Sequence, residues 1–190
     1  MRHAATDWSG RRYCGRTDLP LSADGMTSAR FLAHELAASV EPGLTVVSSP
    51  LRRARQTAEA ILEAIPGSTL AIDSRWSETD FGIAEGLTYD ELRRVAPDIA
   101  KRLVDGAFDV DWPGGEGATA LAARVGAAFH DVVMRATPTV IVSHGGPLTI
   151  AMAIATGQDP SHVVAPEPGR IWRLPADPPV SRHGLREPST

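Results

Sequence analysis

Apolar residues recur every three or four positions in two stretches of the first third of the chain, the spacing of one buried helix face. The first stretch runs from Ser22 to Ser39, with Ser22 as a suitable N-cap. The second runs from Pro50 to about Ile65, and Ser49-Pro50 offers an N-cap followed by a proline at the first helical position. The apolar positions that define the two faces are Ala29, Leu32, Ala33, Leu36 and Ala37, then Ala54, Ala58, Ile61 and Leu62.

Short apolar and β-branched runs alternate with these helices and predict strands. They are Leu44 to Ser48, Leu70 to Ile72 and Thr139 to Ser143, with Ile171 to Leu174 as a candidate last strand. The run at Thr139 carries apolar residues without polar alternation, which is typical of a strand buried on both faces. We therefore expect it inside a sheet.

Helices also fill the second half of the chain. Thr88 and Glu91 form a capping box that opens a helix to about Val104, which Pro97 interrupts. A turn at Gly114-Gly115 precedes a helix whose apolar face carries Leu121, Val125, Phe129, Val132 and Val133. Gly145-Gly146-Pro147 leads from the strand at Thr139 into another helix. This alternation predicts a three-layer α/β/α sandwich with a mostly parallel central sheet and ligand sites at the carboxyl ends of its strands.

The 190 residues are enough for one ordinary domain. We assign it to residues 1–175, because the last residues, 176–190, are rich in proline and charge without apolar periodicity and are predicted to be a loose tail. Arg182-His183-Gly184 lies in that tail. No internal repeat is evident.

Composition narrows the class of protein. A net charge of −4 gives no general attraction to nucleic acid or anionic lipid. The single Cys14 allows neither an intrachain disulfide nor a cysteine cluster for zinc. No secretory signal or membrane-length apolar run is present. We expect a cytoplasmic protein without nucleic-acid or membrane partners.

Three groups of chemically active residues follow predicted strands or open predicted helices: Arg2-His3, Arg52-Arg53 and Ser143-His144-Gly145-Gly146. Arginines, imidazoles and helix N-termini gathered at one sheet edge can hold a phosphate dianion. A histidine nitrogen can also attack phosphorus, provided that a carboxylic acid protonates the departing oxygen. Glu78 is placed to act as this acid, and no residue cluster has the spacing of a metal site.

Five short elements give the chain a wider resemblance. They are Arg2-His3 with the loop from Gly15 to Leu21, Ser48 to Ala58, Glu78 to Gly82 with Glu85-Gly86, Pro113 to Glu116, and Val142 to Gly146. In order and spacing they resemble the histidine phosphatase superfamily, the phosphoglycerate mutase-like branch 1. The resemblance runs from Met1 to about Leu174.

The resemblance implies roles for particular residues. His3 would be the phosphorylated nucleophile, Glu78 the proton donor, and Arg2, Arg53 and His144 the ligands of the phosphoryl oxygens. Arg53 is preferred to Arg52 because the family's arginine directly precedes the position of Ala54. Ser9 and Gly15 would contact the substrate. The implied activity is hydrolysis of a small phosphorylated metabolite without metal or other cofactor.

Two departures from the family pattern affect the start of the chain. An apolar strand normally precedes the Arg-His pair in the middle of the sheet, and here only Met1 stands before it. We expect a truncated first strand and a true start upstream of Met1, since a missing interior strand leaves backbone groups unpaired. Ala4 replaces the usual glycine.

Two other functions stay open at this point. A phosphoglycerate mutase shares all five elements, but the segment from Thr79 to Trp112 is short and its cations are only Arg93, Arg94, Lys101 and Arg102. A catalytically silent protein that binds a phosphorylated ligand is the other alternative. Arg182-His183-Gly184 matches the opening motif by letters, yet it has no predicted scaffold and is interpreted as chance. The sequence is compatible with a homodimer.

Overall fold

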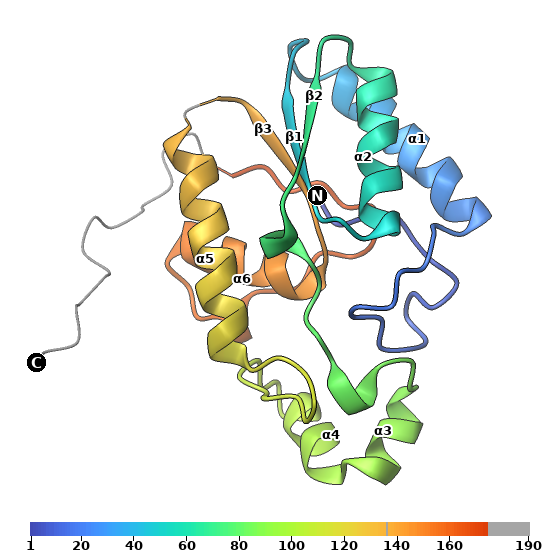
Figure 1. The fold of residues 1–190 in the computed structure, drawn as a ribbon, viewed down its shortest axis with the longest axis vertical. Helices are drawn as coiled ribbons and strands as arrows, with labels where there is room; N and C mark the ends of the chain where they lie inside the picture. The colour runs from blue at the N-terminus through green and yellow to red at the C-terminus, as the bar shows by residue number, and fades with distance from the viewer. Residues whose placement is uncertain (136, 175–190) are drawn as a thin grey trace, which may run out of the picture.

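A three-stranded parallel sheet lies between two layers of helices in the computed structural model, which describes residues 1–135 and 137–174 (Figure 1). The strand order is β2 (Thr69–Ile72), β1 (Thr45–Ser48) and β3 (Thr139–Val142). Val47 of β1 is level with Ala71 of β2 and Ile141 of β3. The predicted three-layer α/β/α fold is confirmed.

Helices α1 (Ala23–Ala37) and α2 (Arg52–Ala64) cover one face of the sheet, and Val46 of β1 packs in their core. The predicted cap of α1 is present, since the Ser22 hydroxyl accepts a hydrogen bond from Gly25 N. Helix α2 begins two residues later than predicted. Ser49 does not cap it: its hydroxyl accepts from Leu51 N, before the first helical residue, and Ser49 N donates to the carbonyl of Val142 as a continuation of the sheet.

Helices α5 (Ala118–Met134) and α6 (Gly145–Thr156) cover the other face, where Val47 and Trp76 join their core. The predicted apolar face of α5 is confirmed at Leu121, Val125 and Phe129. Helix α6 is buried around most of its circumference. Because α6 is buried and begins soon after the end of β3, its N-terminal end lies inside the protein.

Helices α3 (Tyr89–Val95) and α4 (Pro97–Val104) lie at one end of the molecule, at the bottom of Figure 1. The capping box at Thr88 and the interruption before Pro97 are both as predicted. Around Trp112 a separate small core holds these helices against the loop from Gly82. Three short 3-10 turns complete the described elements: Ser74–Trp76, Gly82–Ala84 and Pro160–His162.

The first residues of the chain lie along the outer edge of β3. Ser143 N donates to Met1 O and His3 N donates to Ser143 O, which leaves one parallel bridge, between Arg2 and Ser143. On the other side, Arg2 N donates to Arg170 O and Gly169 N donates to Arg2 O. The first strand is thus reduced to a single bridge. An upstream start stays a prediction.

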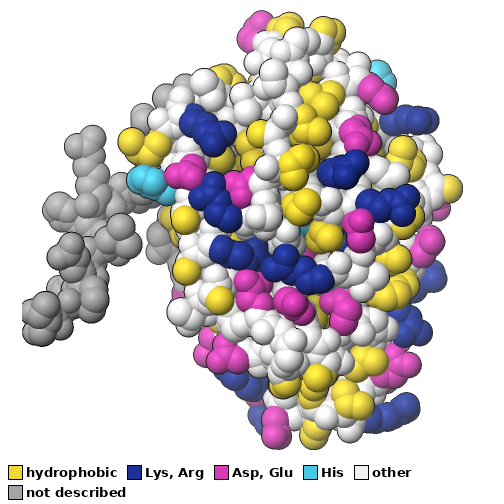
Figure 2. All heavy atoms as spheres, in the orientation of Figure 1, with side chains coloured by type: hydrophobic (Ala, Val, Ile, Leu, Met, Phe, Trp, Pro, Cys, Tyr) yellow, Lys and Arg dark blue, Asp and Glu magenta, His cyan; other side chains and the backbone are white. Residues whose placement is uncertain are grey.

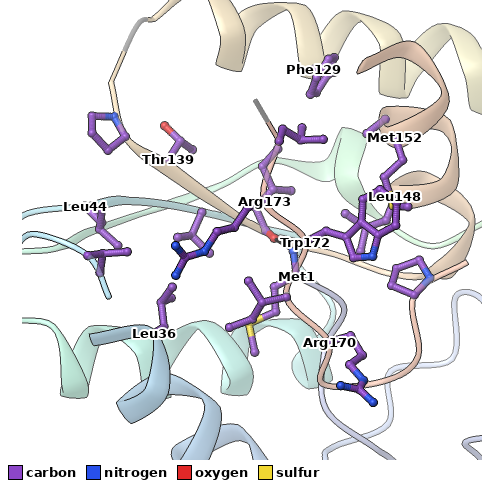
Figure 3. A pocket seen from close by; sticks show the side chains of 18 residues that line it. Met1, Leu36, Leu44, Phe129, Thr139, Leu148, Met152, Arg170, Trp172 and Arg173 are labelled. Atoms are coloured by element: carbon purple, nitrogen blue, oxygen red, sulfur yellow. Dashed lines mark hydrogen bonds between the residues drawn. The ribbon is translucent and has the colours of Figure 1, made fainter. Parts of the chain in front are cut away.

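A mostly apolar cavity of about 370 Å³ opens beside β3, between that strand and the segment from Arg170 to Leu174 (Figure 3). The Met1 ammonium at its end donates to Ile141 O at 2.7 Å, and burial lowers the pKa of this ammonium from 8.0 to about 5. The cavity explains why three residues of β3 are only half-buried, where the sequence predicted a fully buried strand.

The candidate strand at Ile171 to Leu174 is absent. Its neighbour in space, the start of the chain, makes a single bridge, from Arg2 to Ser143, and the backbone hydrogen bonds of Arg2 to this segment stop at Arg170. The predicted domain boundary at 175 and the tail 176–190, with Arg182-His183-Gly184, lie outside the described residues.

Positive and negative side chains alternate across the face shown in Figure 2, without a broad patch of one sign. Within the described residues, none of the helices has the length and apolar character needed to cross a membrane.

Candidate active site

The predicted site residues meet at the carboxyl ends of the strands, where an open parallel sheet places its ligand sites. Arg2 and His3 lie beside the end of β3, and His144 follows the strand after Ser143. Arg53 is the second residue of α2. Glu78 follows the turn at Ser74–Trp76 and reaches the N-terminus of α6. The fold thus brings these five residues together from four distant parts of the chain.

The hydrogen bonds of His3 define which of its two ring nitrogens carries the proton. Its Nδ1 lies 2.7 Å from the carbonyl oxygen of Ala4, which can only accept, so Nδ1 carries the proton. Nε2 then has a lone pair and accepts from Arg53 Nε at 3.3 Å. Burial, followed by the charge of Arg53, lowers the pKa of His3 from 6.5 to about 3. The neutral, nucleophilic form therefore prevails above about pH 3.

Arg53 is completely buried, although it is a cation. Its Nη1 donates to Thr17 O at 2.8 Å, and its Nη2 donates to Cys14 O at 3.2 Å and Gly15 O at 2.8 Å. In the described part of the chain, backbone carbonyls and the imidazole of His3 are thus its acceptors. Carbonyl dipoles satisfy the guanidinium without neutralising its charge.

Arg2 has a buried donor without a partner among the described residues. Its Nη1 donates to Pro166 O at 2.9 Å, but its buried Nε has no acceptor among the described residues. The guanidinium lies against the start of α6, since a Cβ at Gly145 would stand 3.6 Å from its central carbon. Burial lowers the pKa of Arg2 below the usual value of a guanidinium. An orphaned buried donor beside a helix N-terminus is suited to an anionic ligand.

His144 lies against His3, with ring centroids 4.9 Å apart. Its Nε2 is 2.8 Å from Ser49 Oγ, while its buried Nδ1 has no partner within the described ranges. Burial first, and then the nearby His3 and arginines, hold the pKa of His144 well below 6.5. Like Arg2, His144 thus brings to the cluster a buried polar atom without a partner in the described ranges, and the Ser49 hydroxyl orients its ring.

Glu78 occupies the N-terminus of α6, which the sequence predicted to be an open anion site. Its Oε2 accepts from Gly145 N at 3.1 Å, and its Oε1 accepts from Gly146 N at 3.2 Å and Thr79 N at 2.9 Å. A Cβ at Gly146 would come within 2.9 Å of Glu78 Oε1 and 2.5 Å of Thr79 Oγ1. The second glycine is therefore needed for this close approach.

The two predicted substrate contacts are engaged in other bonds. Ser9 Oγ accepts from Thr6 N at 2.9 Å within its own turn. Gly15 donates its N–H to Glu85 and accepts at its carbonyl from Arg53. Their contact with a substrate stays a prediction.

Sequence reasoning missed Arg124, which supports the segment that carries Glu78. Its guanidinium donates to both carboxylate oxygens of Glu116 at 2.6 and 2.8 Å, and to the backbone carbonyl of Glu78 at 3.2 Å. Further bonds reach the carbonyls of Arg75 and Ser77. A usable signal was its place three residues after Leu121, on the buried face of α5, where cations are rare.

Metal ligands do not gather anywhere in residues 1–135 and 137–174: no group of three or more histidine, cysteine, aspartate or glutamate side chains could hold an ion. The positive charge near His3 comes instead from Arg2 and Arg53.

Sequence comparison places these residues in a known family. Residues 1–169 match the histidine phosphatase superfamily (branch 1). A probable phosphoglycerate mutase GpmB of Serratia proteamaculans is 35% identical over 149 residues, covering 76% of this chain and 67% of that protein. The protein of the same name from Escherichia coli O1:K1 is 36% identical over 150 residues, with the same coverage.

Comparison with solved structures supports the same family assignment. A mycobacterial glucosyl-3-phosphoglycerate phosphatase matches with a TM-score of 0.73 and 31% identity, over 84% of this chain and 79% of that one. A putative alpha-ribazole-5'-P phosphatase from Escherichia coli K-12 matches with a TM-score of 0.74 and 25% identity, over 85% of this chain and 80% of that one. The chain therefore belongs to branch 1 of the histidine phosphatase superfamily.

Proposed function

We propose that this protein hydrolyses a small phosphomonoester through a phosphohistidine on His3. The observation that carries the proposal is the geometry of His3: a neutral imidazole with Nδ1 bonded to Ala4 O and the Nε2 lone pair next to Arg53. That nitrogen is prepared for nucleophilic attack. The orphaned donor of Arg2 and the unpaired Nδ1 of His144 lie around it.

In the first step, His3 Nε2 attacks phosphorus while the bond from phosphorus to the ester oxygen breaks. Arg2, Arg53 and His144 bind the other phosphoryl oxygens and stabilise the charge that spreads over them. Glu78 enters this step as the protonated acid and donates its proton to the departing alkoxide. The products of this step are the free alcohol and phosphohistidine.

In the second step, water attacks phosphorus and the bond to His3 Nε2 breaks. Glu78, now a carboxylate, accepts the proton of the water. Inorganic phosphate leaves, and His3 returns to its starting tautomer through its bond to Ala4. No step uses a metal ion, because the arginines supply the positive charge.

Hydrolysis is preferred to phosphoglycerate mutase activity, even though two matched relatives carry the mutase name. The matched structures include phosphatases of a glucosyl-phosphoglycerate and of alpha-ribazole phosphate. The cations between Thr79 and Trp112 are exposed, and three of them pair with local aspartates: Arg93 with Asp90, Lys101 with Asp105 and Arg102 with Asp109. These cations are therefore poorly placed to bind the second phosphate group of a bisphosphate. A cytoplasmic location and a possible homodimer stay predictions.

A direct comparison of the two activities tests the proposal. Purified protein is given a panel of sugar and glycerate phosphates, and phosphate release is measured beside the interconversion of 3- and 2-phosphoglycerate. We expect phosphate release from at least one monoester, unchanged by a chelator, and negligible interconversion. Interconversion faster than release would favour the mutase. Binding of phosphate esters without either reaction would favour the silent binder.

A further inference from the structure

The carboxylate of Glu85 faces a backbone loop instead of a cation. Its two oxygens accept from Gly15 N at 3.0 and 3.1 Å, Arg16 N at 3.2 Å and Thr17 N at 3.2 Å. Three successive N–H groups that converge on one carboxylate fix the conformation of this loop. Glu85 itself is half-buried and directly follows the turn at Gly82–Ala84.

The other side of the same loop holds Arg53. Two peptide groups are shared: the one between Cys14 and Gly15, and the one between Gly15 and Arg16. In each, the N–H points to Glu85 and the carbonyl accepts from Nη2 of Arg53. Two peptide dipoles therefore lie between an anion and a buried cation, aligned favourably with both.

This arrangement determines where the remaining donor of Arg53 points. With Nη1 and Nη2 bonded to carbonyls, Nε is directed to Nε2 of His3 at 3.3 Å. The packing leaves little freedom, since a Cβ at Gly15 would come within 2.3 Å of Thr79 O and 2.6 Å of Glu85 Oε2. A shift of the loop would therefore move Arg53 relative to His3.

We propose that Glu85 is a positioning residue, which orients Arg53 toward His3 through the two shared peptide groups. The inference rests on the proposed function for its catalytic consequence. A carboxylate bonded directly to Arg53 would hold the guanidinium as well, but it would cancel the charge that a phosphate dianion needs. Glu85 acts from behind the loop, so the charge of Arg53 still faces the site.

Glu85→Gln tests the inference, because the amide keeps the size of the side chain but presents one NH₂ group to backbone N–H donors. Glu91→Gln is the matched control: Glu91 also accepts a backbone N–H, from Thr88 at 2.7 Å, and pairs with Arg12, but it does not touch the loop. Glu85→Asp, which keeps the charge, serves if Glu85→Gln does not fold.

Three readouts are measured on each variant: the ¹⁵N signals of the His3 ring, the affinity for orthovanadate, and kcat and KM from steady-state kinetics. We expect Glu85→Gln to shift the Nε2 signal of His3 and to weaken vanadate binding and kcat by about tenfold, with KM changed less. In Glu91→Gln the ring signals and kcat should match the wild type, even if its thermal stability falls.

Unchanged His3 ring signals and vanadate affinity in Glu85→Gln would overturn the inference. So would equal shifts in Glu85→Gln and Glu91→Gln, because they would show a general structural effect. The ring signals need no substrate, so they test the positioning role even if the wild-type protein hydrolyses no phosphomonoester. That last result would count against the proposed function alone.

Discussion

The site has two halves, one around His3 and one around Glu78. In the His3 half, backbone carbonyls bind a buried cation, whereas in the Glu78 half, backbone N–H groups bind a carboxylate. The buried cation Arg53 is surrounded by carbonyls of the loop at Gly15, whereas the carboxylate of Glu78 accepts N–H groups from Thr79, Gly145 and Gly146. Backbone dipoles thus place both charges without pairing them. The arginine charge stays available to a phosphate dianion, and the carboxylate stays available for proton transfer.

The contribution of Glu78 to the rate of hydrolysis is expected to increase with the basicity of the leaving group. Glu78→Gln should slow hydrolysis of an alkyl phosphate by about 10²–10⁴-fold, because the alkoxide then departs without a proton. Hydrolysis of p-nitrophenyl phosphate, whose leaving group needs no proton, should fall much less. Steady-state kinetics on both esters measure this, with Glu63→Gln on the exposed side of α2 as the control. Equal losses on both esters would remove Glu78 from the role of acid.

The His3 half is expected to act on both kinds of ester alike. Arg53→Ala should lower kcat by about 10²–10³-fold on alkyl and aryl phosphates, since it removes charge that stabilises the phosphoryl group in either reaction. Arg52→Ala should have little effect, because Arg52 is exposed and its neighbour is buried. Similar losses of kcat in the two variants would show that the guanidinium of Arg53 has no specific role in catalysis.

Support for the Glu78 half also comes from Arg124, the cation that sequence reasoning missed. Arg124→Lys keeps the charge but cannot bond both Glu116 oxygens and three carbonyls at once. We expect kcat to fall by roughly tenfold, more on alkyl than on aryl phosphates, because the displaced group is the acid. Arg102→Lys is the control, because Arg102 forms an exposed ion pair with Asp109, and this change should leave kcat unaltered on both esters. A loss independent of the ester would place the effect elsewhere.

The last predicted effect concerns stability instead of activity and comes from the buried histidines of the His3 half. The folded protein keeps His3 and His144 neutral, with the pKa of His3 lowered to about 3 by burial and Arg53, whereas the unfolded chain binds protons near pH 6.5. The unfolded state therefore binds more protons between these values, and stability falls as pH drops below 6.5. The loss is at most about 1.4 kcal/mol per pH unit for each histidine.

Urea unfolding at pH 8, 6.5 and 5 measures this dependence. Part of the change between pH 8 and pH 5 comes from the Met1 ammonium, whose pKa burial lowers to about 5. His144→Gln should flatten the dependence below pH 6.5, whereas His34→Gln, on the exposed side of α1, should not. Identical pH profiles in these two variants would contradict neutral burial of His144.

The sequence predicted the elements of the fold well where local signals were strong. Ser22, the capping box at Thr88 and the apolar face of α5 are all where periodicity and capping chemistry place them. The strand predicted at Ile171 was wrong because a strand depends on its neighbour, and the backbone hydrogen bonds of Arg2 to this segment stop at Arg170. Likewise, β3 is half-buried because a cavity lies beside it, which no pattern within the strand could reveal.

The sequence also identified which residues gather in the site, but not what holds them. Nothing local indicates that Glu85 bonds the far side of a loop whose carbonyls bind Arg53. The expectation of a free helix N-terminus after His144 missed Glu78, which lies 67 positions away in the chain and fills it. Such contacts depend on the three-dimensional fold, so the supporting residues emerge only from the structure.

Transfer of phosphate to His3 is the central claim, and rapid-quench labelling tests it most directly. The protein is mixed with a ³²P-labelled substrate of the wild type, quenched in alkali and assayed for acid-labile label on histidine, in the wild type, His3→Ala and His183→Ala. We predict label in the wild type and in His183→Ala, and none in His3→Ala. Label that persists in His3→Ala would contradict the account, as would a wild type that turns over substrate without ever carrying label.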